Sequence, residues 1–574
     1  MILHILKVIL IILEVLVIFN LMIIVHELGH FLAARWRGLV IEKFGIWFGK
    51  PLWKKTINGV EYSLGSIPAG GFVALPQLAP MEVMEGSVQT PRELLPPISV
   101  LDKIIVAFAG PLFSFLLAVV FAVVIWQWGR PVSEPESSTT VGYILEKSPA
   151  AEAGMQVGDK IDSVDGHPVT RFQGMSTDSI AWSVVRSEGE KVSMVVERDV
   201  NGKKETKELW VAPTIPEKTH WWNRKNLRTI GILPSYSFVV GKVQPGSAAE
   251  KAGLHIDDVI TAINGQKMYV PDDLYEYGKT HLTGPYELTV DRPQVDLTNG
   301  ARVHWSDDLK MTKLTLPFDP KGVRIAGVEK DSPAEAAGLK KDDVVLSIDD
   351  HPTNFREQMI DYVGSRAGVP LTFHILRAGQ ELPLKITPQV PLGLPPEMEK
   401  LGKIGAALES TDGLGYENMG KSKLIHPHPG EQVHQSVMAI VNTVDAVLSR
   451  KSSIGVQQMG GPVMMMNAYY HMLSSPEGLR MAIWFSVILN VNLALLNMLP
   501  IPVLDGGHIT LAIIEAVRRK PMNVRILEYV QTTCAMAIIG FMLFIMFFDV
   551  QDLPFVGAKR PVIHFQKVGE EAAK

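Results

Sequence analysis

The stretch that decides the fold is Val8–His30, which reads VILIILEVLVIFNLMIIVHELGH. Its first part, Val8–Val25, is predominantly apolar, with Glu14 as its single charged residue, and a helix needs about 20 predominantly apolar residues to span a bilayer. The stretch ends in the motif His26-Glu27-Leu28-Gly29-His30. On a helix the two histidines lie on one face, so both can bind one zinc ion, with Glu27 beside them as general base. Ionisable side chains are costly in lipid, which favours a functional site over an ordinary surface helix.

A third protein ligand is expected, because catalytic zinc usually has three protein ligands and one open position. The candidate is Asp505, in the segment NMLPIPVLDGGH at residues 497–508. The segment ends another uncharged run, and topology brings Asp505 to the same side of the membrane as His30. His508 is a competing ligand or a group behind the ligands. The other reading of Asp505 is a turn or cap residue.

The same segment contains residues suited to holding an unwound peptide. Pro500 and Pro502 break a helix and expose its backbone. Asn497 offers both a donor and an acceptor to a freed strand. A substrate helix must unwind before water can attack its carbonyl groups, so these residues are candidates for substrate binding.

Four runs are long and apolar enough to span a membrane. They are Val8–Val25, Ile104–Trp128, Met481–Leu504 and Tyr529–Phe548. A signal peptide is the alternative for the first run, but cleavage near Ala34 would discard the histidine motif. Basic residues follow the first and third runs and mark those loops as cytoplasmic. They are Arg35, Arg37, Lys43, Lys50, Lys54, Lys55, Arg518, Arg519, Lys520 and Arg525. The sequence thus predicts a multi-pass membrane protein, with its catalytic motif near the cytoplasmic side and residues 129–480 outside.

That outer region contains an internal repeat. Its three copies are SPAAEAGMQVGDKIDSVDG at Ser148–Gly166, GSAAEKAGLHIDDVITAING at Gly246–Gly265 and SPAEAAGLKKDDVVLSIDD at Ser332–Asp350. Each copy predicts a short helix capped by serine and ended by glycine, then a turn and a β-strand. The pattern resembles the PDZ domains of bacterial proteases, which bind extended peptides at a sheet edge. Substrate C-termini are therefore candidate partners, and the alternative is an array of spacers or assembly surfaces without peptide ligands.

The predicted organisation is a multidomain membrane protein, in which a four-helix core carries three extracytoplasmic, β-rich α+β PDZ domains. Its parts are an N-terminal transmembrane core with β-hairpins (1–128), PDZ domains at 129–222, 223–318 and 319–408, an amphipathic helical linker (409–480), a C-terminal transmembrane core (481–550) and a tail (551–574). The alternation of apolar residues and turns at 44–75 predicts the hairpins. The net charge of −5 argues against a nucleic-acid partner. The single cysteine, Cys534, excludes an internal disulfide and a cysteine zinc cluster.

These motifs together resemble the site-2 protease family of intramembrane zinc metalloproteases, in the regulator-of-sigma-E protease branch of bacteria. The resemblance covers His26–His30, Pro68–Gly71, Ala109–Pro111, Gly460–Pro462 and Asn492–His508, and spans the membrane segments and the repeats. It implies that Zn²⁺ is bound by His26, His30 and Asp505, with Glu27 as the catalytic base.

The resemblance also implies that Asn492 and Asn497 touch the substrate backbone and that the hairpins after Trp47 receive a substrate strand. Ser114 departs from the family, which often has asparagine there, and three PDZ domains exceed the usual one or two. The expected activity is that of a zinc metalloendopeptidase that cleaves single-span membrane proteins, such as anti-sigma factors or signal-peptide remnants, in regulated intramembrane proteolysis. The alternatives are a membrane-anchored PDZ scaffold or chaperone with an inactive metal site and, more remotely, a transporter.

Overall fold

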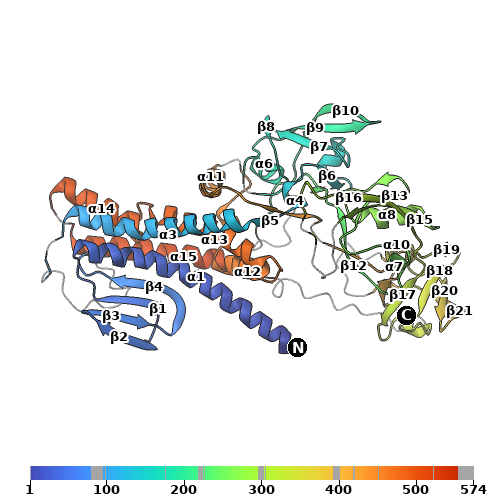
Figure 1. Ribbon diagram of the computed structural model, residues 1–574, viewed down its shortest axis with the longest axis horizontal. Helices are drawn as coiled ribbons and strands as arrows, with labels where there is room; N and C mark the ends of the chain where they lie inside the picture. Colours follow the sequence, from blue (N-terminus) through green and yellow to red (C-terminus); the bar gives the residue numbers. More distant parts are fainter. Residues whose placement is uncertain are drawn as a thin grey trace, which may run out of the picture. The chain divides into compact units, whose positions relative to one another are not determined.

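The long helices and most of the strands occupy separate parts of the chain in the computed structural model (Figure 1). The structure describes residues 2–78, 95–96, 98–174, 176–216, 224, 226–294, 303, 305–391, 401–417, 420–449, 452–520 and 522–553. The chain divides into two units. The helical unit contains residues 1–131, 217–227 and 425–556, and the β-rich unit contains residues 132–216 and 228–424.

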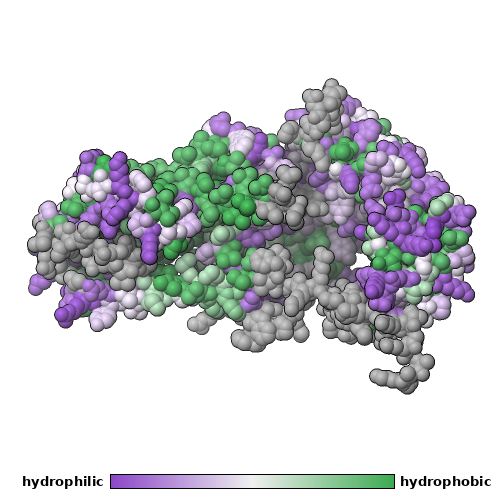
Figure 2. All heavy atoms as spheres, turned by 90° about the horizontal axis from the view of Figure 1, so that it is seen from below, coloured by the Kyte–Doolittle hydropathy of each residue, from purple (hydrophilic) through white to green (hydrophobic). Residues whose placement is uncertain are grey.

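Four helices of the helical unit are long and apolar enough to cross a membrane. They are α1 (Ile2–Arg37), α3 (Val100–Trp128), α13 (Gly478–Asn497) and α15 (Val524–Gln551), and they run side by side in Figure 1. Hydrophobic side chains gather along this unit in Figure 2. The predicted number of spans is confirmed, but α13 ends at Asn497 rather than at Leu504, because Pro500 and Pro502 cannot continue a helix.

The long helices meet where small residues allow close approach. A Cβ on Gly29 of α1 would lie 2.4 Å from the Ala109 carbonyl oxygen of α3, so only glycine fits at this crossing. Farther along α3, Ala118 and Ala122 are buried against Val487 and Val491 of α13. The remaining helices of the unit are α11 (Pro429–Leu448), the 3₁₀ turn η3 (Val456–Gln458), α12 (Pro462–Leu473) and α14 (Asp505–Arg518). One face of α11 packs on the buried residues of α3 and α13, so this amphipathic helix is part of the core.

A four-stranded sheet follows α1, where hairpins were predicted. Its strands are β1 (Lys43–Phe48), β2 (Trp53–Ile57), β3 (Val60–Leu64) and β4 (Ile67–Ala74), in the order β2-β3-β1-β4. β2 and β3 form an antiparallel hairpin, β1 pairs with β3 in parallel, and β4 pairs antiparallel with β1. The strand β4 is therefore an edge strand of this sheet.

The β-rich unit contains three modules built on the repeat. The first has α4 (Glu134–Ser137), β6 (Val141–Ile144), α5 (Pro149–Glu152), β7 (Lys160–Val164), β8 (His167–Pro168), α6 (Ile180–Arg186), β9 (Val192–Val200), β10 (Lys203–Val211) and β11 (Ile232–Pro234). The second has β12 (Phe238–Val243), α7 (Ala248–Lys251), β13 (Val259–Ile263), β14 (Gln266–Lys267), α8 (Asp273–Thr280), β15 (Tyr286–Pro293), β16 (Met311–Phe318) and β23 (Leu414–Tyr416). The third has β17 (Val323–Val328), α9 (Pro333–Ala336), β18 (Val344–Ile348), β19 (His351–Pro352), α10 (Arg356–Gly364), β20 (Leu371–Arg377), β21 (Gln380–Ile386) and β22 (Ala406–Ser410). The strands β5 (Arg130–Ser133) and β24 (Ser422–Ile425) lie where the chain passes between the two units.

The strand pairing shows that the modules are not three consecutive, self-contained segments of the chain. β11 pairs with β6, so residues beyond 222 complete the first module. β23 pairs with β12, so the second module is completed by residues that follow the whole third module. The third module is thus inserted into the second. The strand β22 extends to Ser410 and β23 is formed by Leu414–Tyr416, although the sequence predicted a helical linker from 409 onward.

The three modules share a buried ion pair that the repeat alignment did not reveal. In the first module the guanidinium of Arg198 binds both carboxylate oxygens of Asp159, each at 2.7 Å, and donates to the Gly154 carbonyl at 2.9 Å. The matching pairs are Arg292–Asp258 and Arg377–Asp343. The Asp159 side chain is fully buried. Each pair therefore ties a late strand to the turn that follows the short capped helix.

We predict that Asp159→Asn destabilises the first module by about 3 kcal/mol, because breaking a buried pair leaves Arg198 without its countercharge. Hydrogen exchange of the β7 and β9 amides in the full chain measures this loss. Lys204→Ala, which removes the exposed pair with Glu197, should leave the exchange unchanged. Equal protection in Asp159→Asn and the unmodified protein would contradict the prediction.

Candidate metal centre

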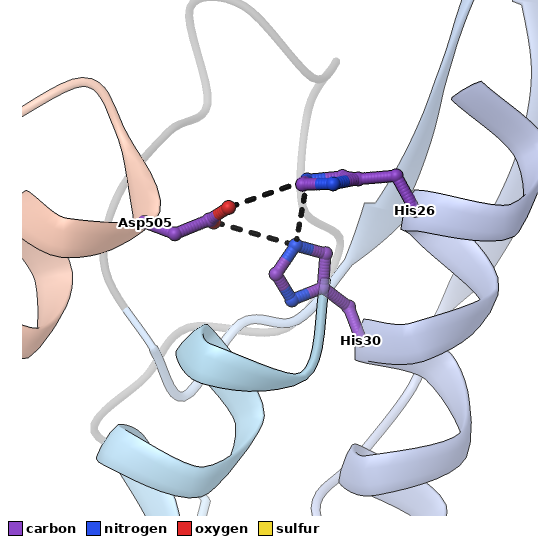
Figure 3. Close-up of side chains that lie close together, drawn as sticks. All are labelled: His26, His30 and Asp505. Carbon is purple, nitrogen blue, oxygen red and sulfur yellow. Dashed lines mark hydrogen bonds and ion pairs between the residues drawn. The ribbon is translucent and has the colours of Figure 1, made fainter. Parts of the chain in front are cut away.

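Three side chains from distant parts of the chain converge in the helical unit. His26 and His30 project from one face of α1, and Asp505 is the first residue of α14 (Figure 3). Between α13 and α14 the chain turns through residues 498–504, which contain both prolines. The turn brings the first residue of α14 back against α1. His26 and His30 are both less than a tenth exposed.

The spacing of the three side chains matches a zinc site. The Nε2 atoms of His26 and His30 lie 3.3 Å apart, and the two Asp505 oxygens lie 3.2 Å from His26 Nε2 and 3.3 Å from His30 Nε2. Tetrahedral zinc with bonds of about 2.0–2.1 Å separates neighbouring ligand atoms by about 3.3 Å. The three residues therefore form a group that can hold a metal ion, with one tetrahedral position left for water or substrate.

Each imidazole is fixed through its second nitrogen. The Nδ1 of His30 donates to the Val106 carbonyl of α3 at 2.8 Å, which leaves Nε2 as the ligand atom. The Nδ1 of His26 lies 3.0 Å from the Ser114 hydroxyl, also on α3. Such contacts behind metal ligands fix the ring orientation and the tautomer. Ser114 is fully buried, so this departure from the family pattern still has a polar contact.

Two glycines make room for the site. A Cβ on Gly110 of α3 would lie 2.1 Å from His30 Nε2, so any larger residue would displace the imidazole. A Cβ on Gly507 would lie 2.1 Å from the Ile501 carbonyl oxygen, within the turn that leads into α14. The positions of His30 and Asp505 thus depend on the absence of side chains beside them.

A cavity of about 300 Å³ opens beside His26, His30 and Asp505. Its polar lining includes Glu27, Asn497 and His508, and its apolar lining includes Val73 and Leu75 from the β4 region. Glu27 therefore borders the same space as the ligand group. His508 lines this space too, but it is not a member of the three-residue group among the described residues.

The remaining predicted site residues are less directly placed. Asn492 lies on α13 and is not among the described residues that line the cavity; its buried Oδ1 has no hydrogen-bond partner among them. Pro500 is exposed and Pro502 is half-buried, and both lie in the turn between α13 and α14. Their predicted substrate contacts stay predictions.

Sequence reasoning did not place Asn20 of α1. Its side chain donates to the Leu16 carbonyl at 2.7 Å and accepts a hydrogen bond from the indole N–H of Trp47. Trp47 has a positive φ of 68° in β1. An asparagine within an apolar run was the signal, because polar groups there need a protein partner. This contact ties α1 to the sheet that follows it.

Two histidines and an aspartate close enough to hold one metal ion, with a glutamate lining the same cavity, are the arrangement expected of a metalloprotease site among apolar helices. The sequence model for "Peptidase family M50" matches residues 14–541. The chain belongs to this family, the site-2 protease family that its motifs resemble.

Full-length relatives agree with this assignment. "Protease RseP" of Yersinia pestis is 25% identical over 517 residues, covering 89% of this chain and 91% of the relative. "Regulator of sigma E protease" of Salmonella typhi is 25% identical over 515 residues, covering 88% and 91%. Other relatives have zinc metalloprotease in their names, and the chain is a zinc metalloprotease. A solved PDZ domain protein from Parabacteroides distasonis covers 49% of this chain at 12% identity, with a TM-score of 0.13.

We predict that Asp505→Ala lowers the zinc content of the purified protein, because it removes one of three ligands from a site that keeps an open position. His508→Ala should keep its zinc. Metal analysis of both variants after dialysis measures the difference. Full zinc in Asp505→Ala together with loss in His508→Ala would mean that the third ligand is His508.

A second prediction concerns the contact behind His26. Ser114→Ala should weaken zinc affinity by about tenfold or more, because partners behind metal ligands typically contribute about 10–100-fold. Competition with a chelator of known affinity measures it. Ser486→Ala is the matched control, since Ser486 is equally buried and bonds to Tyr469 at 2.8 Å. Equal losses in both variants would assign the effect to helix packing.

Proposed function

We propose that the chain is an intramembrane endopeptidase that cleaves single-span membrane proteins. The observation that carries this proposal is the candidate ligand group itself, which joins two histidines of the long apolar helix α1 to the first residue of α14. Its cavity is lined by apolar side chains and by the candidate base Glu27. Anti-sigma factors and signal-peptide remnants are the substrate classes that fit a regulated proteolytic step in a bacterial membrane.

The proposed chemistry follows from the groups that border the cavity. His26, His30 and Asp505 would hold the zinc ion, which would supply Lewis-acid polarisation of the scissile carbonyl and a lowered pKa of water. The Glu27 carboxylate takes the proton from the attacking water and delivers it to the leaving amine. Ser114 and the Val106 carbonyl hold the two imidazoles in the orientation that the ligand group needs.

The substrate must present an extended peptide to this cavity, because a helix hides its carbonyl groups in internal hydrogen bonds. The strand β4 is an edge strand, and its Val73 lines the cavity. A substrate strand added to this edge gains backbone hydrogen bonds. Asn497, which also lines the cavity, offers both a donor and an acceptor to the same strand. Asn492, Pro500 and Pro502 remain proposed contacts on the other side of the substrate.

The proposed location is the bacterial plasma membrane, with the active site near the cytoplasmic face. The basic residues after the first and third spans support this orientation. The three modules of the β-rich unit are proposed to be PDZ domains outside the cytoplasm. Each repeats the serine-capped helix and the glycine turn, and each ends in a strand contributed from later in the sequence.

The alternative function is a membrane-anchored scaffold or chaperone whose metal site is inactive. Glu27 separates the two functions, because a structural metal site needs no base. We predict that Glu27→Gln keeps its zinc and lowers the rate of cleavage by about 10²–10⁴-fold, the usual contribution of a general base.

The test reconstitutes the unmodified protein and Glu27→Gln in liposomes with a single-span model substrate. Cleavage is followed by gel and mass spectrometry, and zinc content is measured in the same samples. Cleavage at the unmodified rate by Glu27→Gln would exclude this mechanism. No cleavage by the zinc-loaded unmodified protein of any single-span substrate tried would favour the scaffold.

A further inference from the structure

One position distinguishes the second module from the other two. In every module the N–H of an alanine in the short capped helix donates to a carbonyl from the segment that completes the module. The three pairs are Ala150 to Ile230 at 3.0 Å, Ala334 to Ile404 at 2.9 Å and Ala249 to Asp412 at 2.9 Å. A glycine with φ near +75° follows each acceptor: Gly231, Gly405 and Gly413. The positions of Ile230, Ile404 and Asp412 are therefore equivalent. At this position the second module has a buried carboxylate, whereas the first and third modules have a buried isoleucine.

The Asp412 carboxylate binds the loop that precedes the edge strand β23. It accepts hydrogen bonds from the Leu414 N–H at 2.9 Å and from the Ser410 hydroxyl at 2.7 Å. Asp412 is 1% exposed, and burial raises the pKa of its carboxyl. A free peptide C-terminus is captured by backbone N–H groups of this kind. In the second module, the chain's own carboxylate already occupies one of them.

A cavity of about 510 Å³ lies beside this loop. Its walls come from β22, β23, the start of α10 and the helix α8. The acidic residues in the lining are Asp272, Glu276, Glu357, Glu409 and Asp412. The basic residue is Arg356, which is paired with Glu357 at 2.8 Å. Five acidic groups against one basic group give the lining a formal charge of −4.

The cavity is held open by the third module. Phe355, which precedes α10, is fully buried in the core of the second module, where a Cβ on Gly278 of α8 would lie 2.3 Å from its ring. The Asn354 amide donates to the Leu282 carbonyl at 2.9 Å. These contacts fix α10 against α8, so the walls are in place before any ligand arrives. A preformed site loses less entropy on binding.

We propose that the second module binds an extended peptide segment bearing lysine or arginine side chains, and that it does not bind a free C-terminal carboxylate. Among the residues that the structure describes, β23 is the last strand of its sheet, so a segment can add to its outer edge by backbone hydrogen bonds. The acidic lining is complementary to cationic side chains, and it repels a terminal carboxylate. Under this proposal, the second module does not recruit substrate C-termini.

The test measures peptide binding by the full-length protein in nanodiscs, with Glu27→Gln as the background so that no peptide is cleaved. Because binding is measured without cleavage, the result tests this proposal independently of the proposed proteolytic function. The probes are three fluorescent ten-residue peptides of one Gly/Ser/Val scaffold. Two are blocked at both ends and bear either two lysines or two glutamates. The third bears two lysines and a free C-terminus.

Fluorescence anisotropy should show binding of the blocked lysine peptide and none of the glutamate peptide. Freeing the C-terminus should weaken binding. The paired substitution Asp272→Asn and Glu409→Gln should weaken binding of the lysine peptide by about tenfold, since each partly exposed ion pair contributes only modestly. The matched control, Glu146→Gln with Glu152→Gln, removes two exposed charges from the first module and should change nothing.

Asp412→Ile gives the second module the residue type of its two neighbours. It should remove the penalty of a free C-terminus, so that the two lysine peptides bind equally or the free one binds better. Protection of the β12 amides in hydrogen exchange would show that Asp412→Ile is folded. If Asp412→Ile is not folded, Asp412→Asn is tested instead. The proposal is overturned if the lysine peptide does not bind, if the glutamate peptide binds as well, if the control weakens binding equally, or if a free C-terminus strengthens binding to the unmodified module.

Discussion

The structure of the helical unit depends on bringing one carboxylate against two imidazoles among apolar helices. A polar group buried in such surroundings costs free energy unless it has a partner. His26, His30 and Asp505 are partners to one another, with separations of 3.2–3.3 Å. Their second contacts, Ser114 and the Val106 carbonyl, both come from α3. The packing of α1, α3 and α14 is therefore set by the same contacts that build the site.

Much of this centre was predictable from the sequence, because its determinants are local or topological. The spacing of His26 and His30 follows from helix geometry. The place of Asp505 follows from counting spans, and the family assignment agrees with the motifs that suggested it. The sequence analysis did not predict the end of α13 at Asn497, although Pro500 and Pro502 follow this residue in the sequence. Apolar composition alone extended the span to Leu504, while the missing backbone donors of the prolines end the helix earlier.

Contacts between residues distant in sequence were not predictable in the same way. Ser114 could be recognised as a departure from the family, but its hydrogen bond to His26 depends on how α3 packs against α1. The partner of Asn20 depends on the fold of β1. In the β-rich unit the repeat located the capped helices correctly, because their signal is contiguous. It could not locate β11 and β23, which join their sheets from outside the repeated segments.

The nested order of the second and third modules has a consequence for how they can diverge. An inserted module is tied to its host at both ends, so Phe355 and Asn354 of the third module contribute to the core and loops of the second. The segment 406–416 completes first one module and then the other. A change in this segment can therefore affect both modules. Asp412 lies in the loop between the two strands and contacts Ser410 of β22 and Leu414 of β23. At this position the second module has a buried acid where the other two modules have isoleucine. Burying a carboxylate costs free energy, and the other two modules avoid this cost at the equivalent position. The carboxylate of Asp412 is therefore better explained by its exclusion of a peptide's C-terminal carboxylate than by a gain in stability.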